Sequence, residues 1–474
     1  MAVPKNRDFA SKIMIPAVFH CSTSLQTQFC QKNISCGNVF LINPVNRIPI
    51  VNITARLLVI CCSFLLLFQT VTAQDNTLVF KDAITANRTK TYNNIVKNII
   101  TKNLSLPLTD STEENWQDAF YALEVLQYKQ PWVLQKVKAA FDEVQKRSSG
   151  FQRALLEFVY TNYQPDFVPQ VAAFAQHTIN AKLLSMCAEY IFANNQKEKY
   201  SNLLHKQITQ IKKSSTGYDF DPFFIILLNK LSKKNYTIPA LKDFFNKNYL
   251  AGQTLVFSLQ RKNRNYAGMA IVRDSIGNFI LDSVGNVFNV PQLARSITNM
   301  PGYITNGNTP QGIFKITGFD VSKSSFIGPT TNMQLLLPFE KSSTIPDSVS
   351  MQFGNNYTSL LPKLWQQYFP VYEAFYAGLA GRSEIIAHGT TVDLNYYKGQ
   401  TYWPHTPTQG CLCTKEIWSG IDGKRTVSDQ QKLVDAVKKA GGANGYLIVI
   451  EIDDQQKPVT INEILPYLKQ AQKK

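Results

Sequence analysis

A glycine followed by a cysteine, with two histidines upstream, is the part of the chain whose residue types could do chemistry. The segment Thr-Gln-Gly-Cys ends at Cys411, and two of the five histidines, His388 and His405, lie shortly before it. A cysteine attacks a carbonyl as the thiolate, so it needs a base that takes its proton or an environment that lowers its pKa. His388 could be that base, and the glycine before Cys411 permits a sharp turn that presents sulfur and backbone amides to a carbonyl. The pattern favours acyl transfer.

The structural alternative is that these side chains only pack. An isolated cysteine is most often a small buried hydrophobic residue. His405 lies in a loop that also holds Tyr396, Tyr402 and Trp403, where an exposed histidine is the simplest interpretation and substrate contact or base duty the second. We expect no metal at His405, because no second histidine, cysteine or carboxylate pair stands at ligand spacing from it.

Three short motifs, in order, give the cysteine a context. Residues 309–314 read Thr-Pro-Gln-Gly-Ile-Phe, residues 388–390 read His-Gly-Thr, and residues 408–411 read Thr-Gln-Gly-Cys. This order resembles the L,D-transpeptidases of the YkuD type over roughly residues 255–455. Gln409 stands where that family usually has histidine and Cys413 where it usually has arginine. The stretch Thr391 to Pro407 looks like an insertion that could form an aromatic lid.

The resemblance implies roles for the site residues. Cys411 would attack the third-residue carbonyl of a peptidoglycan stem tetrapeptide and expel D-alanine, while His388 takes the thiol proton and the Gly389 carbonyl orients the ring. A second amine would then resolve the thioester into a cross-link. No cofactor is implied. Lys415, Arg382 or Lys398 could replace the missing arginine. The residues expected around substrate and oxyanion are Gly410, Gln409, Thr390, His405 and Trp403.

Two other function classes remain open at this stage. In one, water resolves the thioester, so that the protein is an L,D-carboxypeptidase or endopeptidase of wall peptides. In the other, the altered motif marks a non-catalytic wall-binding scaffold. Thiol reactivity of Cys411 would separate the scaffold from both enzymes.

Composition and the N-terminal region favour export. An uncharged run of twelve residues, 57–68, follows Arg56 and precedes small residues ending at Ala73, which is typical of a secretory signal peptide. We therefore interpret residues 1–73 as an upstream extension and signal peptide, the alternative being an uncleaved anchor, and expect a periplasmic or cell-envelope protein with membrane contact only through that segment. Removing residues 1–73 takes six basic and one acidic residue from 49 and 33 and leaves a net charge of +11. The charge is scattered rather than interleaved with aromatics, so we expect no nucleic-acid partner.

The cysteine count does not indicate a disulfide framework. Of the eight cysteines, only Cys187, Cys411 and Cys413 follow residue 73. Three widely spaced thiols leave at least one free, which suits a catalytic thiol. A bond between Cys411 and Cys413 would need an unusual backbone between positions two apart.

Hydrophobic patterning predicts a multidomain α plus β protein. Residues 74–250 read as an all-α domain of short helices, consistent with a helical-repeat array, with a capping box at residues 111–114. Residues 251–474 read as a mostly β, L,D-transpeptidase-like domain with a few helices, one of them capped by Ser428 and ended by two glycines at 441 and 442. The expected strands cover residues 254–259, 270–272, 278–282, 287–290, 315–319, 334–337, 385–387 and 446–452.

Overall fold

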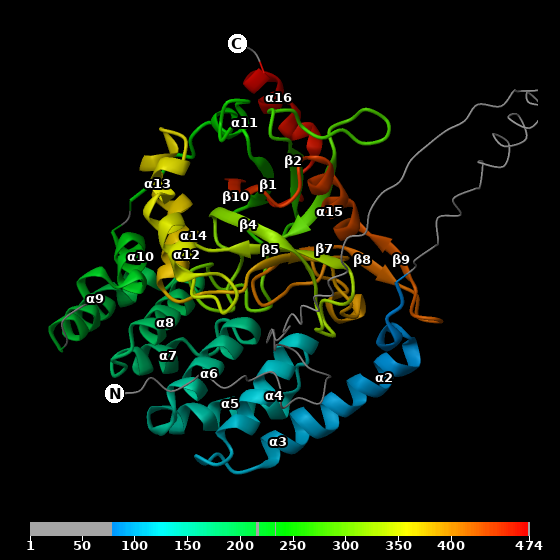
Figure 1. Ribbon diagram of the computed structural model, residues 1–474. Helices are drawn as coiled ribbons and strands as arrows, with labels where there is room; N and C mark the ends of the chain where they lie inside the picture. Colours follow the sequence, from blue (N-terminus) through cyan, green and yellow to red (C-terminus); the bar gives the residue numbers. More distant parts are fainter. Residues whose placement is uncertain (1–77, 215–217, 233, 473–474) are drawn as a thin grey trace, which may run out of the picture. The chain divides into compact units, whose positions relative to one another are not determined.

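A computed structural model describes residues 78–214, 218–232 and 234–472 (Figure 1). The upstream extension and signal peptide predicted over residues 1–73 lie outside the described residues. Those described belong to one compact unit and combine a group of helices with an eight-stranded sheet. Within them, no helix is both long and apolar enough to cross a membrane.

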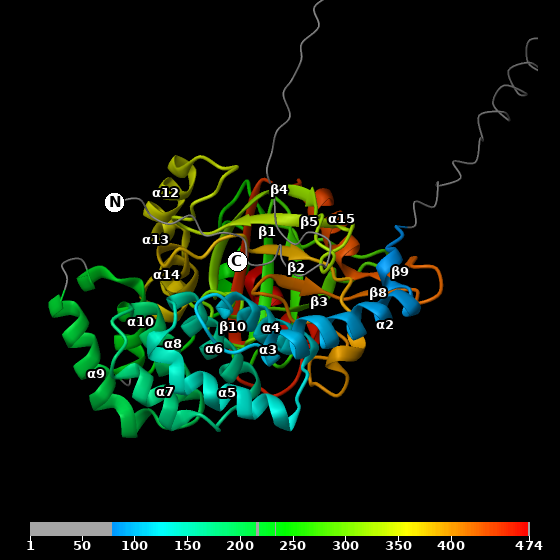
Figure 2. The ribbon, with the colours of Figure 1, turned by 90° about the horizontal axis from the view of Figure 1, so that it is seen from below.

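The first half of the described chain is helical, as the periodicity predicts. Helices α2 to α10 gather on one side of the sheet, which is clear when the ribbon is seen from below (Figure 2). A π-helical segment, Ile95–Thr101, joins the first two of them. The helices are α2 Thr85–Asn94, α3 Lys102–Ser105, α4 Glu113–Leu126, α5 Pro131–Glu143, α6 Ser149–Asn162, α7 Val168–Ala175, α8 Ala181–Ala193, α9 Lys197–Ser214, α10 Pro222–Leu231 and α11 Lys242–Phe245.

The second half forms a closed barrel in the order β1-β10-β4-β5-β6-β7-β3-β2. Two of its neighbour pairs are parallel, β1 with β10 and β6 with β7, and the others are antiparallel. A separate two-stranded ribbon, β8 with β9, stands beside it. The strands are β1 Thr254–Arg261, β2 Gly268–Arg273, β3 Asn289–Leu293, β4 Gly312–Val321, β5 Thr331–Leu336, β6 Ile386–His388, β7 Leu412–Thr414, β8 Glu416–Trp418, β9 Arg425–Ser428 and β10 Gly445–Asp453.

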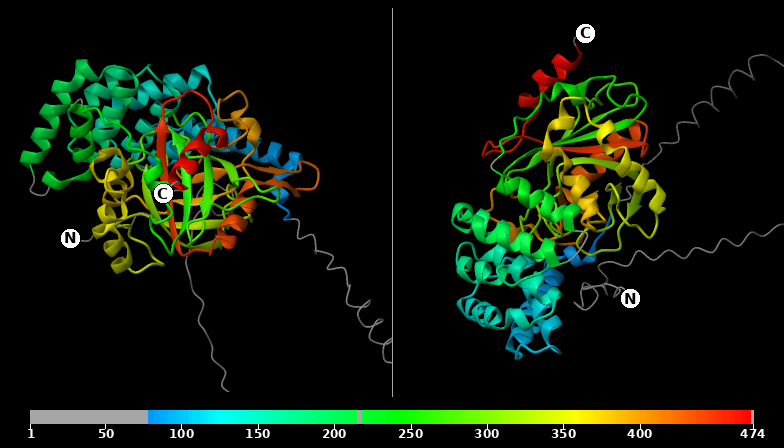
Figure 3. Two further views of the ribbon diagram at one scale, coloured as in Figure 1. Left: turned by 90° about the horizontal axis from the view of Figure 1, so that it is seen from above. Right: turned by 90° about the vertical axis from the view of Figure 1, so that its left-hand side faces the viewer.

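Every residue of β1 and β2 is buried, so both faces of these strands are covered. Along β1, Val256 enters one core together with α15, while Leu255 and Phe257 enter another with α11 and α16. Two views at right angles show these helices around the barrel (Figure 3). The remaining helices are α12 Asp347–Asn355, α13 Tyr357–Leu360, α14 Glu373–Leu379, α15 Asp429–Lys439 and α16 Ile461–Gln472.

The helices and the barrel segment after β3 share one hydrophobic core. Ile297, Met300, Tyr303 and Ile304 are buried in the same cluster as the apolar faces of α4, α6 and α8. The Tyr303 hydroxyl donates to Glu189 of α8 at 2.6 Å. The segment of the barrel that follows β3 therefore packs in the same core as the helices.

Local signals were confirmed in some places and wrong in others. Ser428 caps α15 by accepting from the Gln431 N–H at 2.9 Å, as predicted. The predicted capping box at residues 111–114 is wrong, because α4 begins one residue later and the hydroxyl of its N-cap residue, Thr112, donates to the Pro107 carbonyl instead. The strand predicted over residues 278–282 is reduced to isolated bridges around two turns, in which Asp274 and Asp282 accept from backbone N–H groups.

Candidate active site

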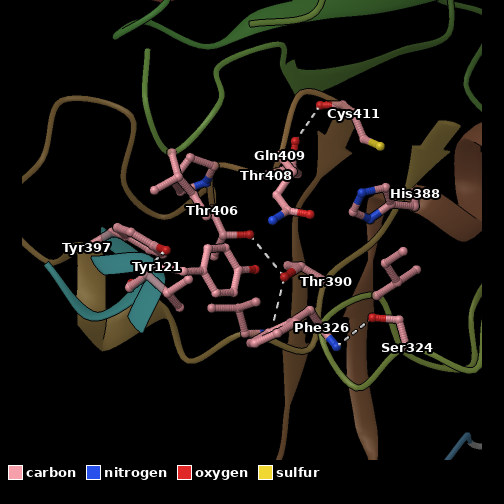
Figure 4. A pocket seen from close by; sticks show the side chains of 15 residues that line it. Tyr121, Ser324, Phe326, His388, Thr390, Tyr397, Thr406, Thr408, Gln409 and Cys411 are labelled. Carbon is pink, nitrogen blue, oxygen red and sulfur yellow. Dashed lines mark hydrogen bonds between the residues drawn. The ribbon is translucent and has the colours of Figure 1, made fainter. Parts of the chain in front are cut away.

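The parallel pairing of β6 and β7 brings His388 and Cys411 together. Ala387 is paired with Leu412, and His388 with Cys413. Side chains alternate between the two faces of a sheet, so Cys411, two residues before Cys413, shares the face of His388. The close-up shows the Cys411 sulfur facing the His388 ring (Figure 4). The parallel pairing thus places these two residues, both named as site residues from the sequence, on one face of the sheet.

The Gly389 carbonyl orients the His388 ring. His388 is 4% exposed, and its Nδ1 lies within hydrogen-bond distance of that carbonyl oxygen. A carbonyl only accepts, so Nδ1 carries the proton and Nε2 keeps a lone pair. Burial lowers the pKa of His388 to about 4, because it penalises the imidazolium. His388 is therefore a neutral acceptor at physiological pH.

Cys411 is half-buried and its thiol is protonated at rest. Sγ lies 3.7 Å from the Glu384 carbonyl oxygen, to which the thiol donates. Burial raises the pKa of Cys411 to about 11, a backbone hydrogen bond from Ile386 and the Arg382 charge oppose this, and Glu384 and Glu340 add to the rise. The resting pair is accordingly a neutral thiol beside a neutral imidazole.

Of the three cations proposed to replace the missing arginine, Arg382 stands beside the thiol. Its guanidinium is buried and bonds to the carbonyls of Gly302, Gly307 and Asn308, with the Gly410 carbonyl 3.5 Å from Nη2. Lys398 is exposed, and Lys415 acts electrostatically on His405. Arg382 is thus a charge with a fixed position rather than a free ligand for substrate.

The two glycines of the site allow close packing. Gly410 has φ +116°, and a Cβ there would come within 1.8 Å of the Arg382 guanidinium. A Cβ on Gly389 would come within 2.2 Å of the Glu416 carboxyl group. The Gly410 N–H, at a residue expected near the oxyanion, donates to the Thr408 hydroxyl at 2.9 Å. No acceptor for the Cys411 N–H is found among the described residues, which leaves that amide for an oxyanion.

A cavity of about 70 Å³ opens beside the thiol, with room for several water molecules. Thr390 and Gln409, two of the residues named from the sequence as near substrate, both line it. Helix α4 contributes to its wall. The lining residues are Tyr121, Val125, Ile297, Ser324, Phe326, Ile327, His388, Thr390, Val392, Tyr397, Thr406, Pro407, Thr408, Gln409 and Cys411.

His405 and Trp403 are not brought into this cavity. His405 is 8% exposed rather than an exposed loop residue, its Nδ1 lies 3.2 Å from the Tyr402 carbonyl, and its Nε2 has no partner among the described residues. Burial lowers its pKa, and the Lys415 charge adds to this. Trp403 is 48% exposed. Neither lines the space in front of Cys411, so sequence proximity to the cysteine was misleading.

Sequence reasoning missed the wall that lies across from the cysteine. Tyr121 and Val125 come from α4, and Phe326 from the turn between β4 and β5. The apolar period of α4 shows that these residues face something buried, but the same period describes ordinary core. No signal in the sequence distinguishes the two.

Comparison with known proteins gives no relative for this chain: no family model, no curated protein and no solved structure matches it. Within the described residues, no group of three or more histidine, cysteine, aspartate or glutamate side chains is placed to hold a metal ion.

Proposed function

We propose that this protein is a cysteine-dependent acyltransferase with Cys411 as nucleophile and His388 as base. The observation that carries the proposal is the His388 ring, whose Nδ1–H is held by the Gly389 carbonyl and which the Cys411 sulfur faces. A base fixed by a third group beside a nucleophile is the arrangement that covalent catalysis requires. A cysteine that only packs needs no such partner.

The reaction would proceed in two steps, formation of a thioester on Cys411 and its transfer to an amine. The Cys411 sulfur attacks the carbonyl carbon of the acyl donor as its proton passes to Nε2 of His388, and the carbonyl oxygen becomes an oxyanion that the Cys411 N–H can bind. Collapse breaks the carbon–nitrogen bond, and His388 returns the proton to the leaving amine. A second amine then attacks the thioester, loses a proton to His388 and releases the thiol.

The neutral resting state shapes this mechanism. Because burial disfavours both thiolate and imidazolium, proton transfer has to accompany attack rather than precede it. Arg382 supports that step, since a buried positive charge beside the sulfur stabilises the developing thiolate.

The substrate we propose is the peptidoglycan stem tetrapeptide, in a reaction like that of the L,D-transpeptidases, carried out in the cell envelope. Support comes from the ordered motifs at residues 309–314, 388–390 and 408–411. In this structure the hydroxyl of Thr309, from the first motif, donates to the carbonyl of Gly410, from the third, at 2.9 Å. The barrel would then be the catalytic part, and the helices its support.

The test is incubation of the purified protein with a stem tetrapeptide, with and without an amine acceptor, followed by mass spectrometry. Cross-linked product with loss of D-alanine supports the transpeptidase, and cleavage without cross-link would make it a hydrolase. The Cys411→Ala variant is the control. Absence of any product, together with no carbapenem adduct on Cys411, would refute acyl transfer.

A further inference from the structure

The cavity beside Cys411 is lined without a formal charge. Its walls combine apolar and aromatic side chains with hydroxyl, amide, thiol and neutral imidazole groups. Arg382 and Glu384 lie near the thiol but are not part of the lining. A charged group placed inside would lose water and gain no ionic partner, which is costly.

The titratable groups of this lining are held neutral by the same cause. Burial raises the pKa of Tyr121 and of Tyr397, raises that of Cys411 and lowers that of His388. Burial disfavours whichever form carries charge. The wall therefore stays uncharged over the physiological range.

Most lining hydroxyls are already engaged. The Thr406 hydroxyl donates to the Thr390 hydroxyl at 2.9 Å, and the latter also accepts from the Val392 N–H. The Thr408 hydroxyl donates to the Cys411 carbonyl at 2.9 Å. Such hydroxyls position the wall and offer little to a polar ligand.

Helix α4 forms one wall of the cavity, and this wall would limit the size of a bound ligand. Tyr121 and Val125 lie four residues apart on one face of α4, and both line the cavity. The Tyr397 hydroxyl donates to the Val125 carbonyl at 3.0 Å and ties this wall to the segment before Cys411. On this side the cavity is thus bounded by a helix, whereas loop residues form much of the remaining wall.

We propose that this cavity is a subsite for a small, uncharged aliphatic group of the acyl substrate, and that Val125 on α4 limits its size. The inference rests on the proposed acyl transfer at Cys411 and adds the substrate class. In a stem peptide, the charged end of the diamino acid would lie outside the cavity, with its aliphatic chain inside.

The experiment measures adduct formation at Cys411 by intact mass and peptide mapping, and so does not depend on turnover. The probes are iodoacetamide, iodoacetate and N-benzyl iodoacetamide, each normalised to its rate with glutathione at the same pH. Val125→Phe narrows the cavity and Val125→Ala widens it. Val284→Phe, the same substitution at a position 77% exposed, is the matched control.

We expect iodoacetamide to react faster than iodoacetate. We also expect Val125→Phe to slow the benzyl probe by about tenfold through overpacking while iodoacetamide changes little, and Val125→Ala to speed the benzyl probe. Preference for iodoacetate, or equal effects of Val125→Phe and Val284→Phe, would overturn the subsite. Since labelling needs no acyl acceptor, inactivity on tetrapeptides with the expected labelling pattern would refute the proposed function alone.

Discussion

Arg382 Nη2 lies 3.5 Å from the carbonyl oxygen of Gly410. The buried guanidinium therefore lies beside the residue that precedes Cys411 in the sequence. No carboxylate lies within ion-pair distance of it in the described part of the chain. Its stronger hydrogen bonds go to carbonyls of the segment 302–308. Burial lowers the pKa of Arg382 to about 10, while Glu373 and Cys411 favour its charged form. The Arg382 charge would therefore be offset by Cys411 only when the thiol becomes a thiolate.

Replacing Arg382 with Met should slow thiolate formation at Cys411. Loss of one nearby positive charge is expected to raise the thiol pKa by about one unit, which means roughly tenfold slower alkylation at a fixed pH below that pKa. The measurement is the rate of iodoacetamide labelling against pH. Lys398→Met, at an exposed position, is the control.

Arg382→Lys separates charge from position. Lysine keeps the charge but cannot reach several carbonyls as a fixed fork does. A labelling profile midway between wild type and Arg382→Met would fit. If the labelling rate of Arg382→Met had the same midpoint in pH as that of the wild type, the guanidinium would serve only to hold the loop in place.

Cys411→Ala should abolish acyl transfer, whereas Cys413→Ala should retain most of it. Cys413 is fully buried, with its sulfur 3.6 Å from the Thr406 hydroxyl, and burial raises its pKa to about 12. It cannot meet a substrate without local opening. Product formation from the tetrapeptide measures both variants, and an inactive Cys413→Ala that remains folded would place the nucleophile two residues later.

His388→Ala should cost about 10²–10⁴ in rate, the usual value of a general base. His405→Ala should cost less than about a hundredfold, because its ring lies outside the cavity and bonds to the Tyr402 carbonyl. Steady-state kinetics on the tetrapeptide decide between them. The opposite order would make His405 the base.

The pH dependence of kcat/KM should show an acid limb near pH 4. His388 accepts a proton only when neutral, and burial lowers its pKa to about 4 from the usual 6.5. The unfolded chain binds that proton more tightly, so stability should also fall as pH drops from about 6.5 to 4. Rates between pH 3.5 and 8 test this.

A change in kcat/KM near pH 7 would come from a group other than His388. Burial raises the pKa of Glu340 to about 7, and this carboxyl acts electrostatically on Cys411. Glu340→Gln would remove such a limb. A limb near 6.5 that survives Glu340→Gln would mean that His388 is solvated during turnover.

Much of the fold follows from local signals. The Ser428 cap, the glycines that end α15 and most of the apolar strands depend on neighbours in sequence and were found close to their predicted places, whereas the strand predicted over residues 278–282 was not. Helix α2 lies within the region predicted to be helical, but none of its residues is buried, so no apolar face in the sequence marks its bounds. The motifs named His388 and Cys411 as site residues, and the β6–β7 register places them on one face of the sheet.

The rest of the site depends on contacts that no local pattern encodes. The sequence does not distinguish Arg382 from the other basic residues. Its role depends on hydrogen bonds to carbonyls of the segment 302–308, which is distant in sequence. In the sequence, Val125 is one of several apolar residues of a helix. Its carbonyl accepts from Tyr397, which lies 272 positions away, so only the fold reveals this contact. His405 was expected at the surface, but it is 8% exposed and its ring lies on the Tyr402 carbonyl, while Trp403 of the same loop is 48% exposed.

Tyr303→Phe tests whether the helices support the site. Its hydroxyl donates to Glu189, which also pairs with Lys230 at 2.6 Å, and the neighbouring Gly302 carbonyl accepts from Arg382. Removing a buried hydrogen bond to a charged group should lower the free energy of unfolding by about 1–3 kcal/mol. Because Tyr303 sits in the helical core, we expect one urea transition by circular dichroism, with the fully buried Cys413 becoming alkylated across the same range. Tyr467→Phe, at a 40% exposed position, should change stability by less than about 0.5 kcal/mol. Alkylation of Cys413 that precedes helix loss would mean that the barrel site opens independently of the helices.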